Sequence, residues 1–305
     1  MDKALKSRPG PLRRWPLAGA AIVALAMAFP SLSQAAAPAT CTGSPQSPGT
    51  LAGSYAGNVS VSGVCFVNGG VADIAGNLTL EPGSALVAAF ARNDVTGQGE
   101  SALHVAGNIR VARGATLLLG CTPRSFPCLD DPSHDHPTLS SAGRVGGSLL
   151  ERAPLGVIVH QTSIAGNVVE DGGGGGVTCD PSGIFAAFGS PVYSDYEDST
   201  VGGSLRIVDL RSCWLGVARV DIARSARFIR NRLQDPDAIE IIDNRIGGDL
   251  ACTGNSMVWD SADISPTGAL FPRQPEPNTV AGARLGQCVL ASPATDGGSP
   301  GPGPF

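Results

Sequence analysis

A short motif that recurs along most of the chain constrains the fold more than any other feature. Its clearest copy reads IAGNL at residues 74–78: an aliphatic residue, a small residue, glycine, a short polar residue and a second aliphatic residue. Further copies begin at residues 55, 105, 145, 164, 201 and 246, and worn copies lie near residues 222 and 280. The chain is therefore a repeat protein, in which each unit contacts mainly its neighbours.

The spacing of the motif indicates the length of one unit. Successive copies are separated by 19 to 40 residues, and several gaps lie near the lower limit. A unit of about 20 residues with insertions fits these gaps, and that is the length of one solenoid coil. Apolar and polar residues alternate after the motif, as in LTL at 78–80, which is typical of a strand with one buried side. The sequence therefore predicts an all-β fold, a parallel β-helix (β-solenoid) of roughly eight or nine irregular coils with disulfide-fastened loops.

The glycine and the polar residue of the motif have separate predicted roles. The glycine stands at a corner between two strands, where it supplies either a positive φ or room for a close approach. The asparagines at the next position should stack along the solenoid, each amide bonding to the coils above and below and so satisfying a polar group that is costly to bury. These asparagines are Asn58, Asn77, Asn108 and Asn167, and Ser148, Ser204 and Asp249 keep an acceptor at the same position.

A β-sandwich with glycine-rich hairpins is the alternative fold, because many short strands separated by turn signals are typical of that class too. A sandwich has no reason to repeat the same polar residue after the same glycine, whereas a solenoid has. The recurrence of the motif in phase therefore favours the solenoid.

The two ends of the chain differ in composition from its middle. Residues 1–35 resemble a cleaved export signal, with a basic start, an apolar run at 17–29 that is too short for a stable membrane anchor, and small residues at 31–35. We expect an N-terminal segment at 36–54, the β-solenoid at 55–290 and a disordered Pro/Gly tail at 291–305. No transmembrane segment is expected after the signal is removed.

The charge of the exported chain excludes two classes of partner. Residues 1–35 hold five of the 21 Lys and Arg side chains and one of the 26 acids, so 16 basic and 25 acidic side chains follow them, and no lysine is among these. Nucleic acid and anionic membrane surfaces both require a basic footprint. The acidic balance therefore argues against either as a partner.

All eight cysteines lie after the export signal, which indicates oxidised pairs in an extracytoplasmic compartment. Proximity in sequence favours Cys41 with Cys65, Cys121 with Cys128, Cys179 with Cys213, and Cys252 with Cys288, although other pairings stay open. A metal cluster is the alternative, but the chain has no close Cys-x-x-Cys pair.

Residues 120–144 form an insertion that is too rich in proline for a regular strand. Five possible metal ligands fall within seven residues of this insertion, namely Asp130, Asp131, His134, Asp135 and His136. Histidine together with carboxylates suits Zn²⁺ or another divalent transition ion. A solvated acidic loop fastened by Cys121 and Cys128 has the same composition and is the simpler interpretation.

Residues 184–200 combine aromatic rings with carboxylates. Tyr193, Tyr196, Asp195 and Glu197 are a candidate ligand-binding set, because rings stack on sugars while acids bond hydroxyl groups. Paired acids such as Asp195 and Glu197 could also serve glycoside hydrolysis. Packing of the same aromatic residues against the flank of the solenoid is the alternative, and it fits the composition equally.

Two further features are interpreted as structural. His160 is expected to be a satisfied side chain at a strand end rather than a catalytic base. The arginines of residues 217–245, Arg219 among them, are interspersed with acids, which indicates surface ion pairs that mark no site.

Several segments together resemble one group of proteins. They are LGV at 155–157 with His160, IAGNV at 164–168, the glycine run before Cys179, YED at 196–198, SCWLG at 212–216, DPD at 235–237, IGGDLAC at 246–252, and PNTVAG at 277–282 with GQC at 286–288. With these segments the chain resembles exported repeat proteins of actinobacteria of unknown function. More distantly it resembles bactofilin-like polymer-forming solenoids and the parallel β-helix of polysaccharide lyases. Neither likeness supplies a catalytic motif that matches residues of this chain.

The sequence leaves two functions open. The first is a secreted structural or binding β-solenoid of the cell envelope or extracellular space, with cell-wall or extracellular polysaccharide or protein as the expected partner and with no cofactor. The second is a β-helix enzyme, a lyase or hydrolase, acting on polysaccharide, which only the analogy of fold supports. No catalytic residue is assigned, because the acids are scattered over loops.

Overall fold

The computed structural model describes residues 38–90, 101–122, 128–129, 140–235, 239–256, 258–259 and 278–289. Two predicted segments, the export signal at 1–35 and the tail at 291–305, lie outside the described residues. The same holds for the candidate metal ligands of the insertion, which are Asp130, Asp131, His134, Asp135 and His136. These predictions therefore remain predictions.

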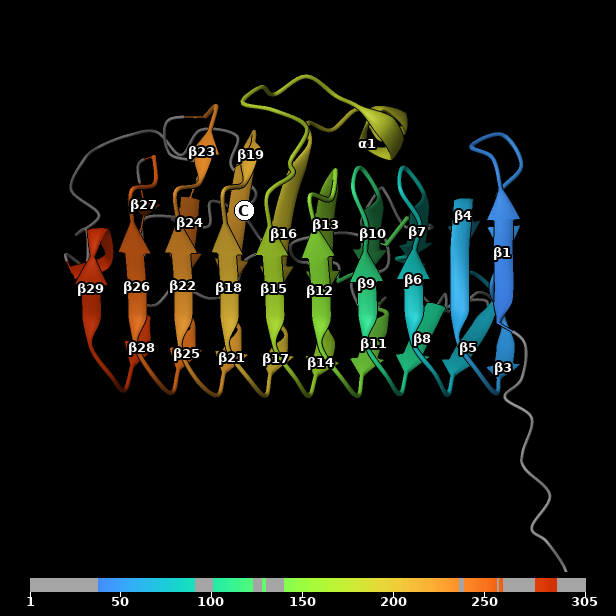
Figure 1. Cartoon of the computed structure of the whole chain (residues 1–305), viewed down its shortest axis with the longest axis horizontal. Coiled ribbons are helices and arrows are strands. Elements are labelled where there is room, and N and C mark those ends of the chain that lie inside the picture. The colour runs from blue at the N-terminus through green and yellow to red at the C-terminus, as the bar shows by residue number, and fades with distance from the viewer. Residues whose placement is uncertain are drawn as a thin grey trace, which may run out of the picture. The chain divides into compact units, whose positions relative to one another are not determined.

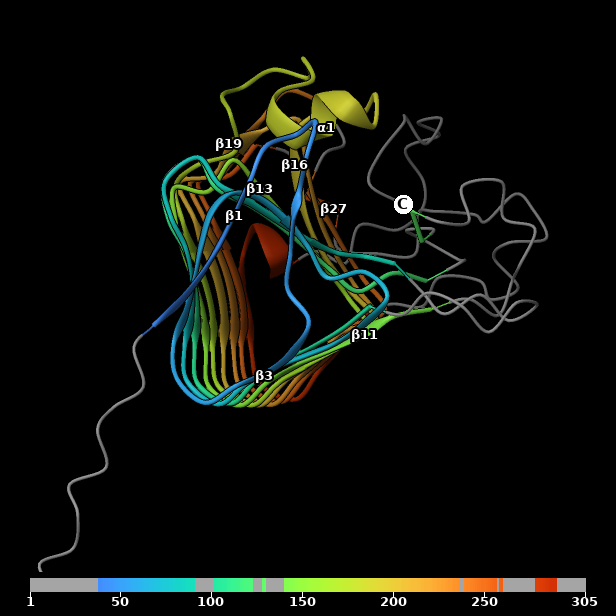
Figure 2. The ribbon, with the colours of Figure 1, turned by 90° about the vertical axis from the view of Figure 1, so that its right-hand side faces the viewer.

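The described chain winds into coils that stack along one axis (Figure 1), and a view along that axis shows three sides enclosing an interior (Figure 2). Each full coil contributes one strand to each side, and we call these sides face 1, face 2 and face 3 in chain order. The strands of each face pair in parallel with the coils before and after them. This arrangement confirms the predicted parallel β-helix and excludes the β-sandwich, whose sheets are antiparallel.

The strands are short, and their bounds follow the corners of the coils. Face 1 holds β3 (Gly53–Tyr55), β5 (Gly70–Ile74), β8 (Ser101–Val105), β11 (Ala142–Val145), β14 (Thr162–Ile164), β17 (Thr200–Val201), β21 (Asp221–Ile222), β25 (Arg245–Ile246) and β28 (Thr279–Val280). Face 2 holds β1 (Ala39–Gly43), β4 (Val59–Phe66), β6 (Leu78–Leu80), β9 (Ile109–Val111), β12 (Leu149–Arg152), β15 (Val168–Asp171), β18 (Leu205–Val208), β22 (Ala226–Ile229), β26 (Leu250–Thr253) and β29 (Arg284–Gly286).

The long strand β4 continues round a corner and belongs to face 3 as well. Face 3 also holds β2 (Gly49–Thr50), β7 (Ala85–Ala88), β10 (Thr116–Leu119), β13 (Gly156–His160), β16 (Tyr193–Glu197), β20 (Trp214–Ala218), β24 (Ile239–Ile242) and β27 (Val258–Trp259). The remaining elements are the helix α1 (Gly183–Ala187), the outlying pair β19 (Arg211–Ser212) and β23 (Arg232–Leu233), and a 3-10 turn at Gln287–Val289. No helix of the described residues is long and apolar enough to span a membrane.

Alternation along the strands fills the interior with aliphatic side chains. Leu78 and Leu80 are fully buried, whereas Thr79 between them is half-buried and faces outward. Equivalent residues from all three faces stack from coil to coil into one continuous core. The period-two pattern seen in the sequence therefore predicts correctly which side of each strand faces the interior.

The glycine of the motif allows a close approach between coils. A Cβ atom at Gly76 would lie 2.5 Å from Asn58 Oδ1 and 2.6 Å from the backbone carbon of Gly57, in the preceding coil. Gly76 is not among the residues with positive φ, so close approach and not a left-handed backbone explains it. Positive φ is used instead at the corner between faces 2 and 3, as at Gly83 and Gly114.

The polar residue of the motif forms the predicted ladder. The Asn77 backbone N–H donates to Asn58 Oδ1 at 2.8 Å, and the Asn108 backbone N–H donates to Asn77 Oδ1 at 2.9 Å. The chain of bonds continues through the side-chain oxygens of Asn108, Ser148 and Asn167. The ladder is confirmed, but it lies at a partly exposed corner rather than in the core, because Asn58 is exposed and Asn77 half-buried.

Two further ladders, at the other corners of the later coils, are buried and were not predicted. At the corner between faces 2 and 3, Asn231 Oδ1 accepts from the Leu210 N–H, and Asn255 Oδ1 accepts from the Asn231 N–H, both at 3.0 Å. At the corner between faces 3 and 1, Asn244 Oδ1 accepts from Val220 N–H at 2.9 Å, and Asn278 Oδ1 accepts from the Asn244 N–H at 3.0 Å. Asn231 is 0% exposed, so its amide has no access to water as a substitute partner.

All four predicted disulfides are present: Cys41–Cys65, Cys121–Cys128, Cys179–Cys213 and Cys252–Cys288. No free cysteine is present in the described chain, which contradicts a cysteine metal cluster. The first and last bridges lie in the terminal coils, where a solenoid lacks a neighbour on one side. Disulfides of this number fit a protein that resides in an oxidising compartment.

The solenoid begins earlier than predicted. The segment 36–54 was separated from the repeats because it lacks the motif, yet β1 pairs with β4 from Ala39 to Gly43 and β2 pairs with β4 at Gly49. The segment therefore forms an incomplete first coil. Backbone pairing, the Cys41–Cys65 bridge and the buried Leu51 hold it in place, and none of these repeats the motif that marks the other coils.

The buried ladder should matter more for stability than the ladder at the partly exposed corner. We expect Asn231→Ala to lower the free energy of unfolding by about 1–3 kcal/mol, because it leaves buried backbone groups unpaired. Asn77→Ala is the matched control and should cost about 1 kcal/mol or less, since water can replace its amide. Chemical denaturation of the oxidised protein measures both values, and equal losses would contradict the difference in burial.

Candidate functional site

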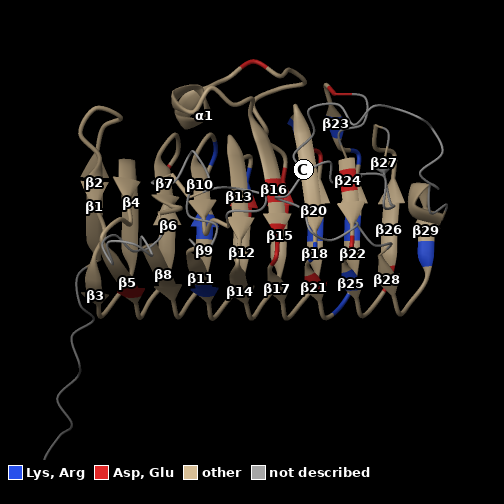
Figure 3. Ribbon diagram, turned by 180° about the vertical axis from the view of Figure 1, so that it is seen from behind, with Lys and Arg blue, Asp and Glu red and all other residues tan. Residues whose placement is uncertain are grey.

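The strand β16 brings together polar side chains on both of its sides. Its alternation directs Ser194 and Tyr196 into the interior of the solenoid and Tyr193, Asp195 and Glu197 outward from face 3. Every residue of the strand is nevertheless buried. Acidic residues colour β15 and β16 red in the ribbon of Figure 3, whereas the nearby β18 and β22 carry basic residues. We describe the outward group and the inward group in turn.

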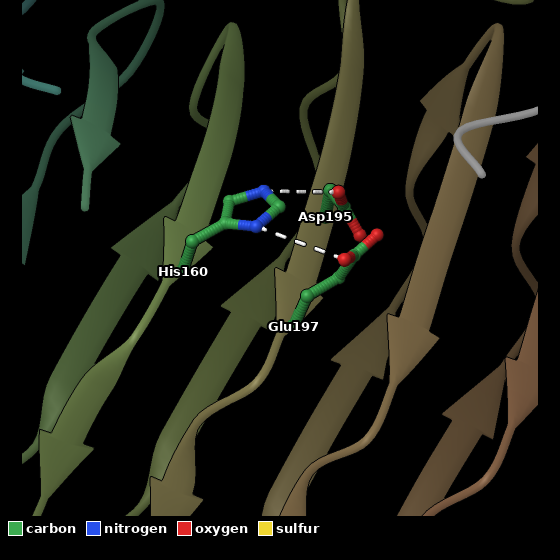
Figure 4. Close-up of side chains that lie close together, drawn as sticks. All are labelled: His160, Asp195 and Glu197. Atoms are coloured by element: carbon green, nitrogen blue, oxygen red, sulfur yellow. Dashed lines mark ion pairs between the residues drawn. The ribbon is translucent and has the colours of Figure 1, made fainter. Parts of the chain in front are cut away.

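The outward group, which we call the outer cluster, consists of His160, Asp195 and Glu197. The end of β13 supplies His160, and the register of β13 with β16 sets His160 opposite Glu197. His160 Nε2 lies 3.2 Å from Asp195 Oδ2, and His160 Nδ1 lies 3.7 Å from Glu197 Oε2. Each ring nitrogen therefore faces one of the two carboxyl groups, and both carboxyl groups lie on the same side of the imidazole (Figure 4).

A guanidinium group completes the outer cluster from the next coil. Arg219, at the corner that follows β20, is bonded through one terminal nitrogen to Glu197 Oε2. Its Nε also donates to Asp198 Oδ1 at 2.8 Å. Asp198 and Arg219 both have a positive φ, of 48° and 55°, because they occupy the same corner position in successive coils. Arg219 therefore pairs with a buried acid, which corrects the expectation that the charges of 217–245 form only surface pairs.

Burial controls the proton equilibria of the outer cluster. It lowers the pKa of His160 below its usual value, although Glu197 and Asp198 act in the opposite direction. Burial also raises the pKa of Asp195 to about 7, against the opposing charge of Arg219. For Arg219, burial acts to lower the pKa, but the charges of Glu197 and Asp198 outweigh it and hold the pKa above the usual value. At neutral pH the imidazole is therefore largely uncharged and Asp195 is close to half-protonated.

The inward group, which we call the inner cluster, consists of Glu151, Glu170, Ser194 and Tyr196. Glu151 on β12 and Glu170 on β15 are register neighbours, and both point into the interior. Tyr196 Oη lies 2.6 Å from Glu151 Oε2 and 3.1 Å from Glu170 Oε2, while the Ser194 hydroxyl donates to Glu170 Oε1 at 2.7 Å. One phenol hydrogen cannot serve both acids, so a proton on one carboxyl group completes the network.

The same conclusion follows from the pKa values of the two acids. Burial raises the pKa of Glu151 well above its usual value, and the neighbouring Glu170 raises it further. Burial raises the pKa of Glu170 to about 7, against the opposing hydrogen bonds from Ser194 and Tyr196. Glu151 Oε1 has no hydrogen-bond partner among the described residues. The inner cluster is thus a carboxyl network that holds a proton within an otherwise apolar core.

The structure places the predicted ligand-binding residues in these two clusters. Asp195 and Glu197 both lie in the outer cluster, but both are buried. Tyr193 packs against Phe185 and Trp214, with ring centroids 5.6 and 5.5 Å apart. Tyr196 faces the interior and is 2% exposed. Neither ring offers a face for stacking on a sugar, so burial favours packing, the alternative weighed for these aromatic residues.

Three functional side chains were missed in the sequence, although coil spacing could have identified them. Glu151 and Glu170 are 19 residues apart, the same gap that separates the motif glycines Gly147 and Gly166. Arg219 follows Glu197 by 22 residues, close to the length of one coil. His160 lies at the end of β13, the predicted strand end, but its burial and its two acidic neighbours were not predicted.

Three grooves on the described surface include almost none of the residues of the outer and inner clusters. One runs along the corner between faces 1 and 2 and is lined by small residues such as Ala165, Gly202 and Ala223. A second follows the same corner near Ala75 and Ala106. A third crosses face 2 beside Arg110 and Arg152, and Glu151 is part of its lining. None of these three grooves is lined by His160, Asp195 or Glu197.

Comparisons with known proteins assign no family to this chain. No family model, no curated protein and no solved structure matches it. The chemistry of the two clusters is therefore the basis for the function proposed below.

The inner cluster predicts a specific dependence of stability on pH. Because the folded-state pKa of Glu170 is about 7, above the usual value of 4.5, its stabilising protonation is complete below pH 4.5 and is lost as the pH rises through 7. Glu151 and Asp195 act in the same direction, whereas His160, with a lowered pKa, opposes them below about pH 6.5. We therefore expect the protein to unfold less readily at pH 5 than at pH 8.

Glu170→Gln tests this prediction, because glutamine mimics the protonated acid. In denaturation titrations between pH 4.5 and 7, the slope of stability against pH should fall by up to about 1.4 kcal/mol per pH unit, the value for one proton. Exposed Asp221→Asn is the control and should leave the slope unchanged. An identical slope in Glu170→Gln and the parent would contradict the raised pKa.

Arg219 should contribute far more to stability than an exposed arginine. We expect Arg219→Ala to lower the free energy of unfolding by about 3–5 kcal/mol, because it leaves the buried Glu197 carboxylate without its guanidinium partner. Arg230→Ala removes the exposed pair with Asp209 and should leave the free energy of unfolding nearly unchanged. Denaturant titration at pH 7 compares the two variants, and similar losses would show that Glu197 does not depend on Arg219.

Proposed function

We propose that this protein is a secreted structural or binding β-solenoid of the cell envelope or extracellular space. Its four disulfides support residence in an oxidising compartment. Its coils repeat the same hydrogen-bonded corner from Asn58 to Ala283, which supports a rigid, elongated element. A regular solenoid surface suits extended contact with a polymer or a protein more than it suits the enclosure of a small substrate.

The observation that carries the proposal is the burial of the outer cluster. His160, Asp195 and Glu197 are 0%, 1% and 0% exposed, and Arg219 is bonded to one of the acids. A hydrolase or lyase must bring substrate within a few ångströms of its acid and base, so these groups normally line an open cleft. The outer cluster instead has the character of an ion-paired network within the protein.

The surface offers a shape for binding that differs from an active site. The two grooves along the corner between faces 1 and 2 follow the solenoid axis and are floored by alanine and glycine. Short polar and charged side chains border them, including Asp73, which lies 2.8 Å from His104 Nδ1, and Asp221, which pairs with Arg245. Open linear grooves of this kind support contact with an extended polysaccharide or protein segment.

A polysaccharide-acting enzyme is the second candidate function. It is favoured by the pKa of about 7 at Asp195, since catalytic acids and bases often have such shifted values. A buried ion-pair network shifts pKa values in the same way, because burial alone raises the pKa of an acid. The candidate therefore depends on whether substrate reaches Asp195.

The test is a search for turnover. We expect the purified, oxidised protein to release no unsaturated or reducing sugar ends from pectin, alginate, glucan or peptidoglycan, with or without added Ca²⁺ or Zn²⁺. Boiled protein sets the background. Release above this background that Asp195→Asn or Glu197→Gln abolishes, while the variant keeps the parental melting temperature, would establish the enzyme instead.

A further inference from the structure

The outer cluster combines three side chains that are metal ligands in other proteins. An imidazole and two carboxylates are the ligand types that Zn²⁺ and related divalent ions take. One donor atom from each of His160, Asp195 and Glu197 lies within 4.8 Å of the other two. All three side chains are buried, so a bound ion would be shielded from competing water.

The distances within the cluster fit a small tetrahedral ion. Two nitrogen or oxygen ligands at about 2.0–2.1 Å from such an ion lie about 3.3 Å from each other. His160 Nε2 and Asp195 Oδ2 are 3.2 Å apart, which matches that edge. The Glu197 carboxylate offers an oxygen within 4.8 Å of the other two donor atoms, so it would have to approach by no more than about 1.5 Å to reach the same spacing.

Hydrogen bonding within the cluster is incomplete. Asp195 Oδ1 is buried and has no hydrogen-bond partner among the described residues. Buried carboxylate oxygens are normally hydrogen-bonded or bound to a metal. The described residues also gather three carboxyl groups, those of Asp195, Glu197 and Asp198, around a single guanidinium group.

We propose that His160, Asp195 and Glu197 bind a divalent transition-metal ion of the Zn²⁺ class, which joins β13 to β16 across two neighbouring coils. Arg219 holds Glu197 in the metal-free protein, and it also holds Asp198 through both Nε and a terminal nitrogen. When Glu197 turns toward the ion, Arg219 keeps its bonds to Asp198. This metal site does not depend on the proposed function, because an ion that links two neighbouring coils requires no ligand or substrate at the surface.

The experiment uses the protein from residue 36 to residue 305, with its disulfides oxidised, after treatment with a chelator. Calorimetric titration with ZnCl₂ should show one ion bound per chain, and the melting temperature should rise with added Zn²⁺. Co²⁺ as a probe should give the absorption bands of a four-coordinate ion with nitrogen and oxygen ligands. Asp195→Asn and His160→Gln should each weaken Zn²⁺ binding at least about tenfold. Loss of a residue that only supports a metal ligand already lowers affinity by about this factor, so loss of a ligand itself should lower it at least as much.

Two controls locate the site. The exposed pair His104 and Asp73 also joins an imidazole to a carboxylate, so His104→Gln should leave Zn²⁺ binding unchanged. The variant with both His134→Ala and His136→Ala removes histidines of the insertion and should likewise retain binding. If Asp195→Asn unfolds, Glu197→Gln measured by the Co²⁺ spectrum takes its place.

Three results would overturn the proposal. The first is no Zn²⁺ binding to the parent protein, which would make the outer cluster an ion-pair network only. The second is binding that persists unchanged in folded Asp195→Asn and His160→Gln. The third is binding lost only in the variant of His134 and His136, which would place the ion in the insertion.

Discussion

The repeated corner between faces 1 and 2 is the constraint on which the rest of this structure depends: a row of backbone bonds links each coil to the preceding one, and beside it a backbone N–H donates to a side-chain oxygen of that coil. At Asn77 this bond reaches Asn58 Oδ1 at 2.8 Å, and the same bond recurs at Asn108 and Ser148. It forms only because glycine stands beside it: a Cβ at Gly76 would meet the accepting oxygen at 2.5 Å. Glycine and a short polar residue therefore occur together at most of these corners, and the backbone bonds that set the height of each coil continue where Arg224 takes the glycine position. Once that height is set, strands of all three faces pair in register and their aliphatic side chains stack into one core.

Insertions between coils are tolerated provided that the chain returns to the same corner. The longest described excursion runs from Gly172 to Val192, between β15 and β16, and contains α1. The strand that follows it is held on both sides, by Glu151 and Glu170 from the interior and by His160 and Arg219 from outside. The bridge from Cys179 to Cys213 ties the excursion to the next coil. Polar contacts are therefore concentrated at a strand that directly follows a long excursion.

The sequence predicted the repeated part of this fold and missed what occurs in single coils. The motif revealed the parallel β-helix, the Asn58 to Asn167 ladder and the inward direction of Leu78 and Leu80, because each of these repeats. The disulfides were predictable because local pairing suits a solenoid, where neighbouring coils lie about 20 residues apart. Arg219 was placed on the surface because its acidic partner is one coil away, and the sequence distance of 22 residues has meaning only once the insertions have been placed. Tyr196 shows the same limit. Nothing in the sequence YSDYE at 193–197 indicates that Tyr196 takes the place of an inward aliphatic residue and contacts two buried acids.

Buried charges are costly, so their presence here requires a compensating benefit. Desolvation of an ion pair often exceeds the attraction gained, and hydrophobic residues of similar size usually stabilise a fold at least as well. A solenoid of near-identical coils has a particular difficulty, because an aliphatic strand fits almost equally well against several neighbours. The Glu151 to Tyr196 bond at 2.6 Å and the contact of His160 with Asp195 form only when β16 lies in one position relative to β12 and β13. A strand displaced by one coil, or by two residues, would leave these acids buried without partners. The two clusters thus oppose misregistration at the coil where an insertion makes it most probable, and they do so by penalising the wrong arrangement more than by stabilising the right one.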